Sequence, residues 1–338
     1  MTSRWLFSTV GRRGYAAEYF KAIDPSVYIL GTGNSPEAPA FRECDDARIV
    51  PSIADPTYQE HILELVERER IENILTFSDL DVVVLAEIRD ELSALGANCF
   101  FPGEKLARLA QDKLATAQWS ANNGMPSAKA SMDLADFDED TPLIVKPRRG
   151  SSSVGLAFPS DHEHAASAAV GIDEAMFQER VFGTEVNLEI CGDLDGRPVR
   201  CSAWRKHHSR GGETDLSRTV RTDELVELAW KLGSALELIG PNDIDLMVND
   251  DGFYLIEVNT RFGGGYPVSE LAGAGFPAAL LAMSQGKTVE QEATYRDGIW
   301  MLKANKPFGG TEAEMQQLLG VSLEAHFGTE KAWSTPND

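Results

Sequence analysis

Residues 244–261, IDLMVNDDGFYLIEVNTR, decide the fold prediction for this chain. Apolar and polar side chains alternate on both sides of the DDG sequence at 250–252, which predicts two antiparallel strands joined by a short turn. A three-residue turn that ends in glycine sets Asp245 opposite Glu257. Asn259 shares the face of Glu257, because side chains two positions apart on a strand point the same way. Two carboxylates and one amide oxygen are therefore expected on one sheet face.

Facing carboxylates repel each other, so a cation is expected between them. Hard oxygen ligands without histidine or cysteine nearby favour Mg²⁺, with Mn²⁺ as the second choice. The spacing alone leaves a solvated polar sheet face as the alternative. Arg261 follows on the same alternation and would stabilise charge that develops beside the metal. The glycines at 263–265 would let a ligand approach the backbone closely, or would form a flexible turn.

Upstream, residues 143–158, LIVKPRRGSSSVGLAF, place Lys146 at the end of one strand and a second strand after the loop. Backbone amides and the hydroxyls of Ser151, Ser152 and Ser153 can bind phosphates there, with the lysine as a point charge. The segment is not a Walker A loop, since GxxxxGK[ST] is absent. An ordinary hairpin turn is the alternative.

Residues 177–190, FQERVFGTEVNLEI, contain an interruption between two strands that Glu179 and Glu185 bracket. Extended backbone there could offer a donor and an acceptor to an adenine edge, and a carboxylate could bind ribose hydroxyls. A solvated connection is the alternative. Between residues 200 and 221 six basic residues outnumber two acidic ones, which suggests an anion pocket rather than a randomly cationic loop: Arg200, Arg205, Lys206, Arg210, Arg218 and Arg221.

Composition limits the function classes. The chain has 338 residues, enough for about two domains, with 43% apolar residues. Acidic residues outnumber basic ones 53 to 31, and the net charge of −22 argues against a nucleic-acid partner or an anionic membrane. No signal peptide or membrane-spanning stretch is predicted. Four scattered cysteines predict no disulfide framework, so a cytoplasmic location is expected.

Domain organisation follows from a change of pattern near residue 102. Residues 1–101 alternate short strands with amphipathic helices, including helices expected at 58–70 and 81–95, which predicts an open α/β domain with a parallel sheet. GxGxxG is absent after the first strand, so a dinucleotide fingerprint is missing. From 102 to about 290, strands follow one another in pairs, which predicts an α+β body.

The order and spacing of these segments resemble the ATP-grasp superfamily, most closely the branch around the large chain of carbamoyl-phosphate synthase. The resemblance runs from about residue 106 to 271. It implies a nucleotide site in which lysines and the serine loop bind phosphates, the hinge binds adenine, and a carboxylate binds ribose. The residues implied are Lys113 and Lys146 with Ser151, Ser152 and Ser153, then Glu179 and Val181 at adenine, and Glu185 at ribose.

The resemblance also implies the metal and catalytic groups. Asp245, Glu257 and Asn259 would surround Mg²⁺, although Asp245 stands where that branch often has glutamine. Arg261, with Arg205 or Arg210, would stabilise an acylphosphate and the later oxyanion, and Lys146 would hold the transferred phosphates. The implied architecture is an α/β N-terminal domain (1–101) and an α+β ATP-grasp fold (102–290). Two ATP-grasp subdomains, about 115–182 and 183–290, would grip ATP between their sheets, and a C-terminal extension (291–338) would pack on this body.

The implied function is an ATP-dependent carboxylate–amine ligase that forms an amide bond through an acylphosphate and releases ADP and phosphate. Its partners would be a small carboxylate and an amine, both resembling amino acids. The oligomeric state stays open, and a dimer is compatible with the sequence. A phosphotransferase of the same fold and a non-catalytic nucleotide-binding regulatory module remain alternatives. The complete set of implied site residues weighs against the regulatory module.

Overall fold

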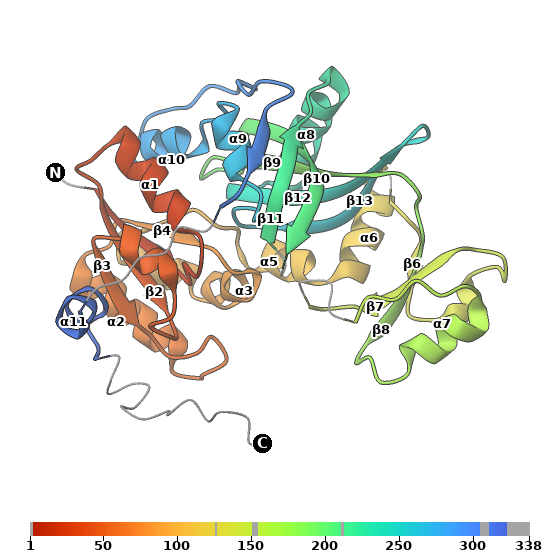
Figure 1. The fold of residues 1–338 in the computed structure, drawn as a ribbon, viewed down its shortest axis with the longest axis horizontal. Coiled ribbons are helices and arrows are strands. Elements are labelled where there is room, and N and C mark those ends of the chain that lie inside the picture. The colour runs from red at the N-terminus through yellow and green to blue at the C-terminus, as the bar shows by residue number, and fades with distance from the viewer. Residues whose placement is uncertain (1–2, 126, 151–154, 211–212, 305–310, 323–338) are drawn as a thin grey trace, which may run out of the picture. The chain divides into compact units, whose positions relative to one another are not determined.

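The computed structural model describes residues 3–125, 127–150, 155–210, 213–304 and 311–322 (Figure 1). The chain divides into two compact units. One comprises Met1–Cys99 with Ala304–Asp338, and the other comprises Phe100–Lys303. The division between Cys99 and Phe100 lies close to the change of sequence pattern near residue 102. Among the described residues, no helix is both long and apolar enough to cross a membrane.

The first unit is built on a five-stranded sheet with the strand order β3-β2-β1-β4-β5. All four strand pairs are parallel, as the strand–helix alternation predicts. Apolar side chains cover the central strands, where Trp5 and Phe7 of the first strand are fully buried and meet Phe20 of the following helix edge to face. The strands are β1 (Arg4–Ser8), β2 (Tyr28–Gly33), β3 (Asp46–Ile49), β4 (Asn73–Thr76) and β5 (Asn98–Cys99).

The helices of this unit connect and flank the strands. The helix expected at 58–70 is α2, whereas the one expected at 81–95 is two helices, α3 and α4, separated at Ile88. Helix α11 contacts β3 and η1 of this unit, so the expectation that all of 291–338 packs on the second unit is wrong for α11. The helices are α1 (Gly14–Ile23), η1 (Pro39–Glu43), α2 (Tyr58–Glu69), α3 (Asp79–Glu87), α4 (Arg89–Ala94) and α11 (Glu312–Leu319).

The second unit contains a six-stranded sheet with the strand order β13-β12-β9-β10-β11-β14, antiparallel throughout. One face carries buried apolar side chains such as Leu188 and Ile244, and helix α8 (Asp223–Leu236) packs on β9 and β10. The other face carries Asn187, Glu189, Asp243 and Asp245 on β9 and β12, and this part of the sheet is the polar face. The strands are β9 (Thr184–Gly192), β10 (Pro198–Arg210), β11 (Glu213–Thr219), β12 (Gly240–Asn249), β13 (Gly252–Asn259) and β14 (Trp300–Leu302).

A three-stranded antiparallel sheet, ordered β6-β8-β7, precedes the large sheet in the sequence of this unit. Helix α7 packs on it through a cluster that includes Phe137, Val145, Ala165 and Phe177. The second strand expected after the serine loop is reduced, among the described residues, to a bridge between Val145 and Ala157. The elements are β6 (Ala130–Ser131), η2 (Leu134–Asp136), β7 (Leu143–Pro147), α7 (His162–Ala169) and β8 (Ala175–Glu179).

Four further helices complete the second unit. Helices α5 (Glu104–Gln111) and α6 (Lys113–Asn122) contact β13. Helix α9 (Pro267–Leu271) packs on β10, β11 and β14, and α10 (Phe276–Ser284) is a short apolar helix with contacts to β10. The candidate site is built from the start of α6, the end of β7, the middle of β12 and the end of β13.

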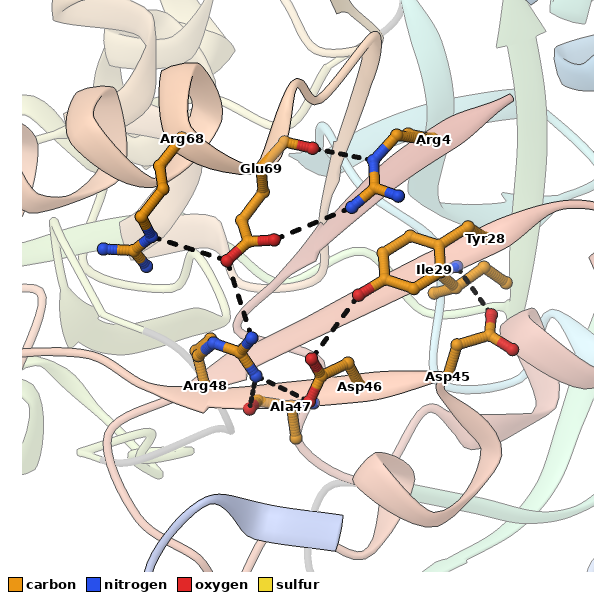
Figure 2. A network of polar contacts seen from close by, with 9 residues as sticks. All are labelled: Arg4, Tyr28, Ile29, Asp45, Asp46, Ala47, Arg48, Arg68 and Glu69. Atoms are coloured by element: carbon orange, nitrogen blue, oxygen red, sulfur yellow. Dashed lines mark hydrogen bonds and ion pairs between the residues drawn. The ribbon is translucent and has the colours of Figure 1, made fainter. Parts of the chain in front are cut away.

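In the first unit, Figure 2 shows a polar network around the Glu69 carboxylate at the end of α2. Glu69 forms ion pairs of 3.6 Å with Arg4, 3.5 Å with Arg48 and 3.4 Å with Arg68. Arg4 also donates a 2.7 Å hydrogen bond to the backbone carbonyl of Glu69. The network therefore joins α2 to β1 and β3.

We expect Glu69→Gln to lower the free energy of unfolding by about 1 kcal/mol, because a partly exposed carboxylate with several cationic partners contributes at the upper end of surface ion pairs. Urea denaturation followed by circular dichroism measures this value. The difference should shrink in high salt. Glu67→Gln, an exposed change on the same helix, is the control, and equal effects of the two changes would contradict the role of the network.

Candidate functional site

The β12–β13 hairpin sets the registry of the candidate site. Its turn has two residues, Asp250 and Asp251, so Asn249 pairs with Gly252 and not with Phe253 as a three-residue turn requires. A β-bulge between Asp245 and Leu246 absorbs the one-residue difference. Asp245 consequently faces Glu257, as the sequence predicts, although the turn has two residues where the sequence predicts three.

Acidic groups crowd the polar face around Asp245. Asp243 faces Asn259, two pairs further along the hairpin and on the same face. Asn187 of β9 donates hydrogen bonds to both aspartates, with 2.9 Å to Asp243 Oδ1. Burial, followed by repulsion from Asp243 and Glu257, raises the pKa of Asp245 well above its usual range. The face therefore holds more negative charge than its own donors compensate.

Two lysines from outside the hairpin approach these carboxylates. The Nζ atom of Lys113, at the first position of α6, lies 3.2 Å from Glu257 Oε1 and also donates to the carbonyl of Gly150. Lys146 of β7 is only 7% exposed. Burial lowers its pKa to about 8, against the attraction of Glu257. Elements that are far apart in sequence thus bring ammonium and carboxylate groups together.

Asp112 fixes the start of α6 and with it the position of Lys113. Its side chain caps the helix by accepting a 3.0 Å hydrogen bond from the Ala115 amide. Arg148, just after β7, donates two hydrogen bonds of 2.8 Å and one of 2.5 Å to the same carboxylate. Burial raises the pKa of Asp112, but these hydrogen bonds outweigh it and the net pKa is lowered. Asp112 thereby ties the start of α6 to the segment after β7.

The predicted adenine and ribose residues lie on the connection from β8 to β9. Glu179 ends β8, and its amide donates a 2.8 Å hydrogen bond to the carbonyl of Lys129. The carbonyl of Phe182 accepts a 3.0 Å hydrogen bond from Asn249, so the hairpin end of β12 holds this connection, in which Val181 is half-buried. Glu185 pairs with the ammonium of Lys206.

Arg261 lies on the polar face, where its Nη1 atom is 3.3 Å from Asp243 Oδ2. Asn259 donates a 3.2 Å hydrogen bond to the backbone carbonyl of Asp243. Arg205 is different, because it pairs with Val186 of β9, and Val186 pairs with Leu246 on the apolar face. The prediction that Arg205 acts beside the metal residues is therefore wrong, since it lies on the opposite side of the sheet.

The remaining predicted site residues are only partly described. Arg210 ends β10, where its backbone pairs with that of Glu213. Ser151, Ser152 and Ser153 lie outside the described residues, so their phosphate role stays a prediction. The basic segment 200–221, which the sequence left between a loop and an anion pocket, forms most of β10 and β11 as far as it is described.

Glycines 263 and 265 are explained by close contact within the protein, whereas the sequence suggested a ligand. A Cβ atom at Gly263 would lie 2.5 Å from Glu189 Oε1 and 2.8 Å from the carboxylate of Asp243. One at Gly265 would lie 2.3 Å from the ring of Trp204. The backbone after Arg261 therefore runs directly over the polar face and covers Glu189.

Sequence reasoning missed Glu189 and Asp243. Glu189 is fully buried and accepts a 3.2 Å hydrogen bond from Trp204 Nε1, while its Oε2 finds no hydrogen-bond partner in the described part of the chain. Burial, and then repulsion from Asp243, raises its pKa well above the usual range. Strand alternation could have indicated both residues. Asp243 lies two positions before Asp245 and Glu189 four positions after Glu185, so each points to the same face as its predicted neighbour. The cross-strand pairing of Asp243 with Glu189 needed the structure.

The donor set at the hairpin fits a magnesium ion that also binds phosphate. Among the described residues, no three histidine, cysteine, aspartate or glutamate side chains form a ready metal cage. Magnesium commonly takes one or two protein carboxylates and completes its shell with phosphate and water. Asp245, Glu257 and Asn259 supply such a partial set, and a cation there would offset the repulsion between Asp245 and Glu257 that face each other on the hairpin.

Comparison with protein families divides the chain as the structure does. Residues 5–100 match the family described as PylC-like, N-terminal domain. Residues 110–265 match the family described as ATP-grasp domain. The second match contains all the candidate site residues from Lys113 to Arg261.

Three of the named relatives are two ligases and a synthase subunit. A D-alanine–D-alanine ligase of Syntrophotalea carbinolica is 27% identical over 47% of this chain and 58% of its own length. A 3-methyl-D-ornithine–L-lysine ligase of Methanosarcina acetivorans is 24% identical over 83% of this chain and 73% of its own. A carbamoyl phosphate synthase large chain of Pseudothermotoga lettingae is 24% identical over 70% of this chain and 23% of its own. The chain thus spans just over half of the first of these relatives.

Solved structures show the same fold. The biotin carboxylase domain of the Hydrogenobacter thermophilus 2-oxoglutarate carboxylase, solved as a dimer with MgADP, ADP and bicarbonate, has a TM-score of 0.67 at 17% identity. The likeness covers 89% of this chain and 73% of that one. The two family matches and the shared fold lead to one conclusion: residues 110–265 are an ATP-grasp domain, and a PylC-like N-terminal domain precedes it.

Proposed function

We propose that the chain is an ATP-dependent carboxylate–amine ligase that forms an amide bond through an acylphosphate. One observation carries the proposal. Lys113 of α6 meets Glu257 of β13 at 3.2 Å, with Lys146 of β7 buried beside them. Two ammonium groups suited to phosphates thus lie near Glu257 and Asp245, two carboxylates suited to Mg²⁺. The names of the relatives, which include amino-acid ligases, support the same reaction class.

ATP would bind with its triphosphate at Lys113 and Lys146 and its ribose at Glu185. Glu179 and Val181 would contact adenine through the backbone, and Ser151, Ser152 and Ser153 would add phosphate donors. Asp245, Glu257 and Asn259 would hold Mg²⁺, which when bound neutralises phosphate charge. The MgADP in the Hydrogenobacter neighbour supports this choice of cofactor.

The reaction would proceed in two displacements. A carboxylate oxygen of the first substrate attacks the γ-phosphorus, the bond to the β-phosphate oxygen breaks, and ADP leaves. The neutral amine of the second substrate then attacks the acyl carbon, phosphate leaves, and the amine loses a proton. Arg261 would stabilise the acylphosphate and the tetrahedral oxyanion, while Lys146 positions the transferred group. A catalytic role for Arg210 stays part of the proposal, and Arg205 has none.

Amino acids are the proposed substrates. Arg261, which forms an ion pair with Asp243 on the polar face, would contact the carboxyl group of one of them. The relative named for 3-methyl-D-ornithine and L-lysine acts on substrates of this class and supports the choice.

A cytoplasmic location is part of the proposal. All four cysteines are free and buried, which is compatible with a reducing compartment. A dimer is also proposed, with the dimeric Hydrogenobacter neighbour as support, and light scattering would test it.

The direct test is an ADP-release screen with amino acids offered singly and in pairs. A ligase releases ADP in proportion to amide product and only when acid and amine are both present. ADP release with one substrate and no amide would indicate the phosphotransferase alternative. Failure of the protein to bind ATP would reject the proposed function.

We expect Glu257→Gln to reduce turnover by about a hundredfold or more, because it removes a charge from the metal set and a partner of Lys113. Stability in the absence of ligand should be unchanged or slightly higher, since repulsion with Asp245 falls. Steady-state assays at several Mg²⁺ concentrations and thermal unfolding measure the two effects. Glu227→Gln on the exposed side of α8 is the control. Turnover near that of the unaltered protein would contradict the metal role.

We expect Lys146→Ala to weaken ATP binding by about tenfold while adenosine binding changes little, because the lost ammonium would contact phosphate and not the nucleoside. Calorimetric titration with both ligands measures the difference. Lys231→Ala on α8 serves as the matched control. An equal loss for ATP and adenosine would show a disturbed fold in place of a phosphate contact.

A further inference from the structure

Lys206 is the one lysine of β10, and the reading of the sequence gave it no individual role. Its neighbour Arg205 pairs with Val186 on the apolar face, so Lys206 points to the polar face. There its Nζ atom pairs with the carboxylate of Glu185 on the adjacent strand, and its side chain is 28% exposed. Lys206 therefore stands on the same side of the sheet as Asp245 and Glu257.

The surroundings of Lys206 are strongly acidic. Burial alone lowers its pKa, but attraction to Asp245, to Glu185 and to Asp243 outweighs burial, and the pKa of Lys206 is raised. Asp245 exerts the largest electrostatic attraction, while Glu185 acts through both a hydrogen bond and its charge. The ammonium therefore contacts the predicted ribose carboxylate and is attracted by the predicted metal carboxylate on the same face.

Resting on the proposed ligase function, we propose that Lys206 is a third ammonium of the nucleotide site, which neutralises Glu185 in the free protein and binds a phosphate oxygen of ATP when Glu185 accepts the ribose hydroxyls. The exchange follows from charge and hydrogen bonding. A ribose diol offers two hydroxyl donors to the Glu185 carboxylate and competes there with the ammonium.

Magnesium at Asp245 would weaken the largest electrostatic attraction that acts on Lys206 and leave that of Asp243. The triphosphate then becomes the strongest anion near the Lys206 ammonium, and the flexible four-carbon stem lets the ammonium move without a change in the strand. Lys206 would thus link occupation of the ribose site to occupation of the phosphate site.

Calorimetric titration of the full chain with MgATP and with adenosine tests the proposal. Lys206→Gln should weaken MgATP binding by about tenfold, the effect of one charge-assisted hydrogen bond. Its adenosine affinity should stay equal or rise, because Glu185 is released from its partner. Lys206→Arg should retain most of the MgATP affinity. Arg205→Gln, one residue away on the opposite face, is the matched control and should bind both ligands like the unaltered protein.

Each outcome decides the matter. Unaltered MgATP affinity in Lys206→Gln would overturn the role of Lys206 and leave the proposed function standing. Equal losses for MgATP and adenosine would also overturn it, since they indicate a structural role only. If the unaltered chain binds no MgATP, the proposed function and this inference both fail.

Discussion

The structure of the second unit depends on one sheet face that carries five carboxyl groups. Asp243, Asp245, Glu185, Glu189 and Glu257 come from three adjacent strands, and their negative charges repel one another. Cations supplied by other elements hold them: Lys113 from α6, Lys206 from β10 and Arg261 after β13. Helix α8 secures the opposite face by apolar packing, so the sheet can present this charge on one side. The protein without ligand thus neutralises its own site with the groups that a nucleotide and its metal would engage.

The fold and much of the site could be predicted from the sequence, because they rest on local patterns. Strand–helix alternation gives the parallel sheet of the first unit, and period-two alternation gives the β12–β13 hairpin with Asp245 opposite Glu257. The contact between Lys113 and Glu257 joins residues 144 positions apart, and only the family resemblance indicated it. Asp112 caps α6 and also accepts hydrogen bonds from Arg148. The pairing with Arg148 gave no signal in the sequence, because the two residues are 36 positions apart and no local pattern connects them.

The misses have specific physical causes. Arg205 and Lys206 are adjacent in a basic segment, and composition cannot tell which of two neighbours faces a site. The pairing of Arg205 with Val186 of β9 shows that Arg205 points to the apolar face and Lys206 to the polar face. Glu189 was missed because its importance comes from burial under Gly263 and from Trp204, which lie 74 and 15 positions away. The glycines at 263 and 265 were associated with a ligand, yet the atoms they accommodate belong to Glu189, Asp243 and Trp204.

The bulge beside Asp245 has a consequence for how such a chain can change over evolution. It takes up the offset between a two-residue turn and the pairing of Asp245 with Glu257. A strand without it would transmit every insertion or deletion at the tip to the carboxylates and turn alternate side chains to the wrong face. With the bulge as a local joint, the tip and the base of the hairpin can vary separately. Homologous hairpins of unequal tip length can therefore keep the same chemistry at their base.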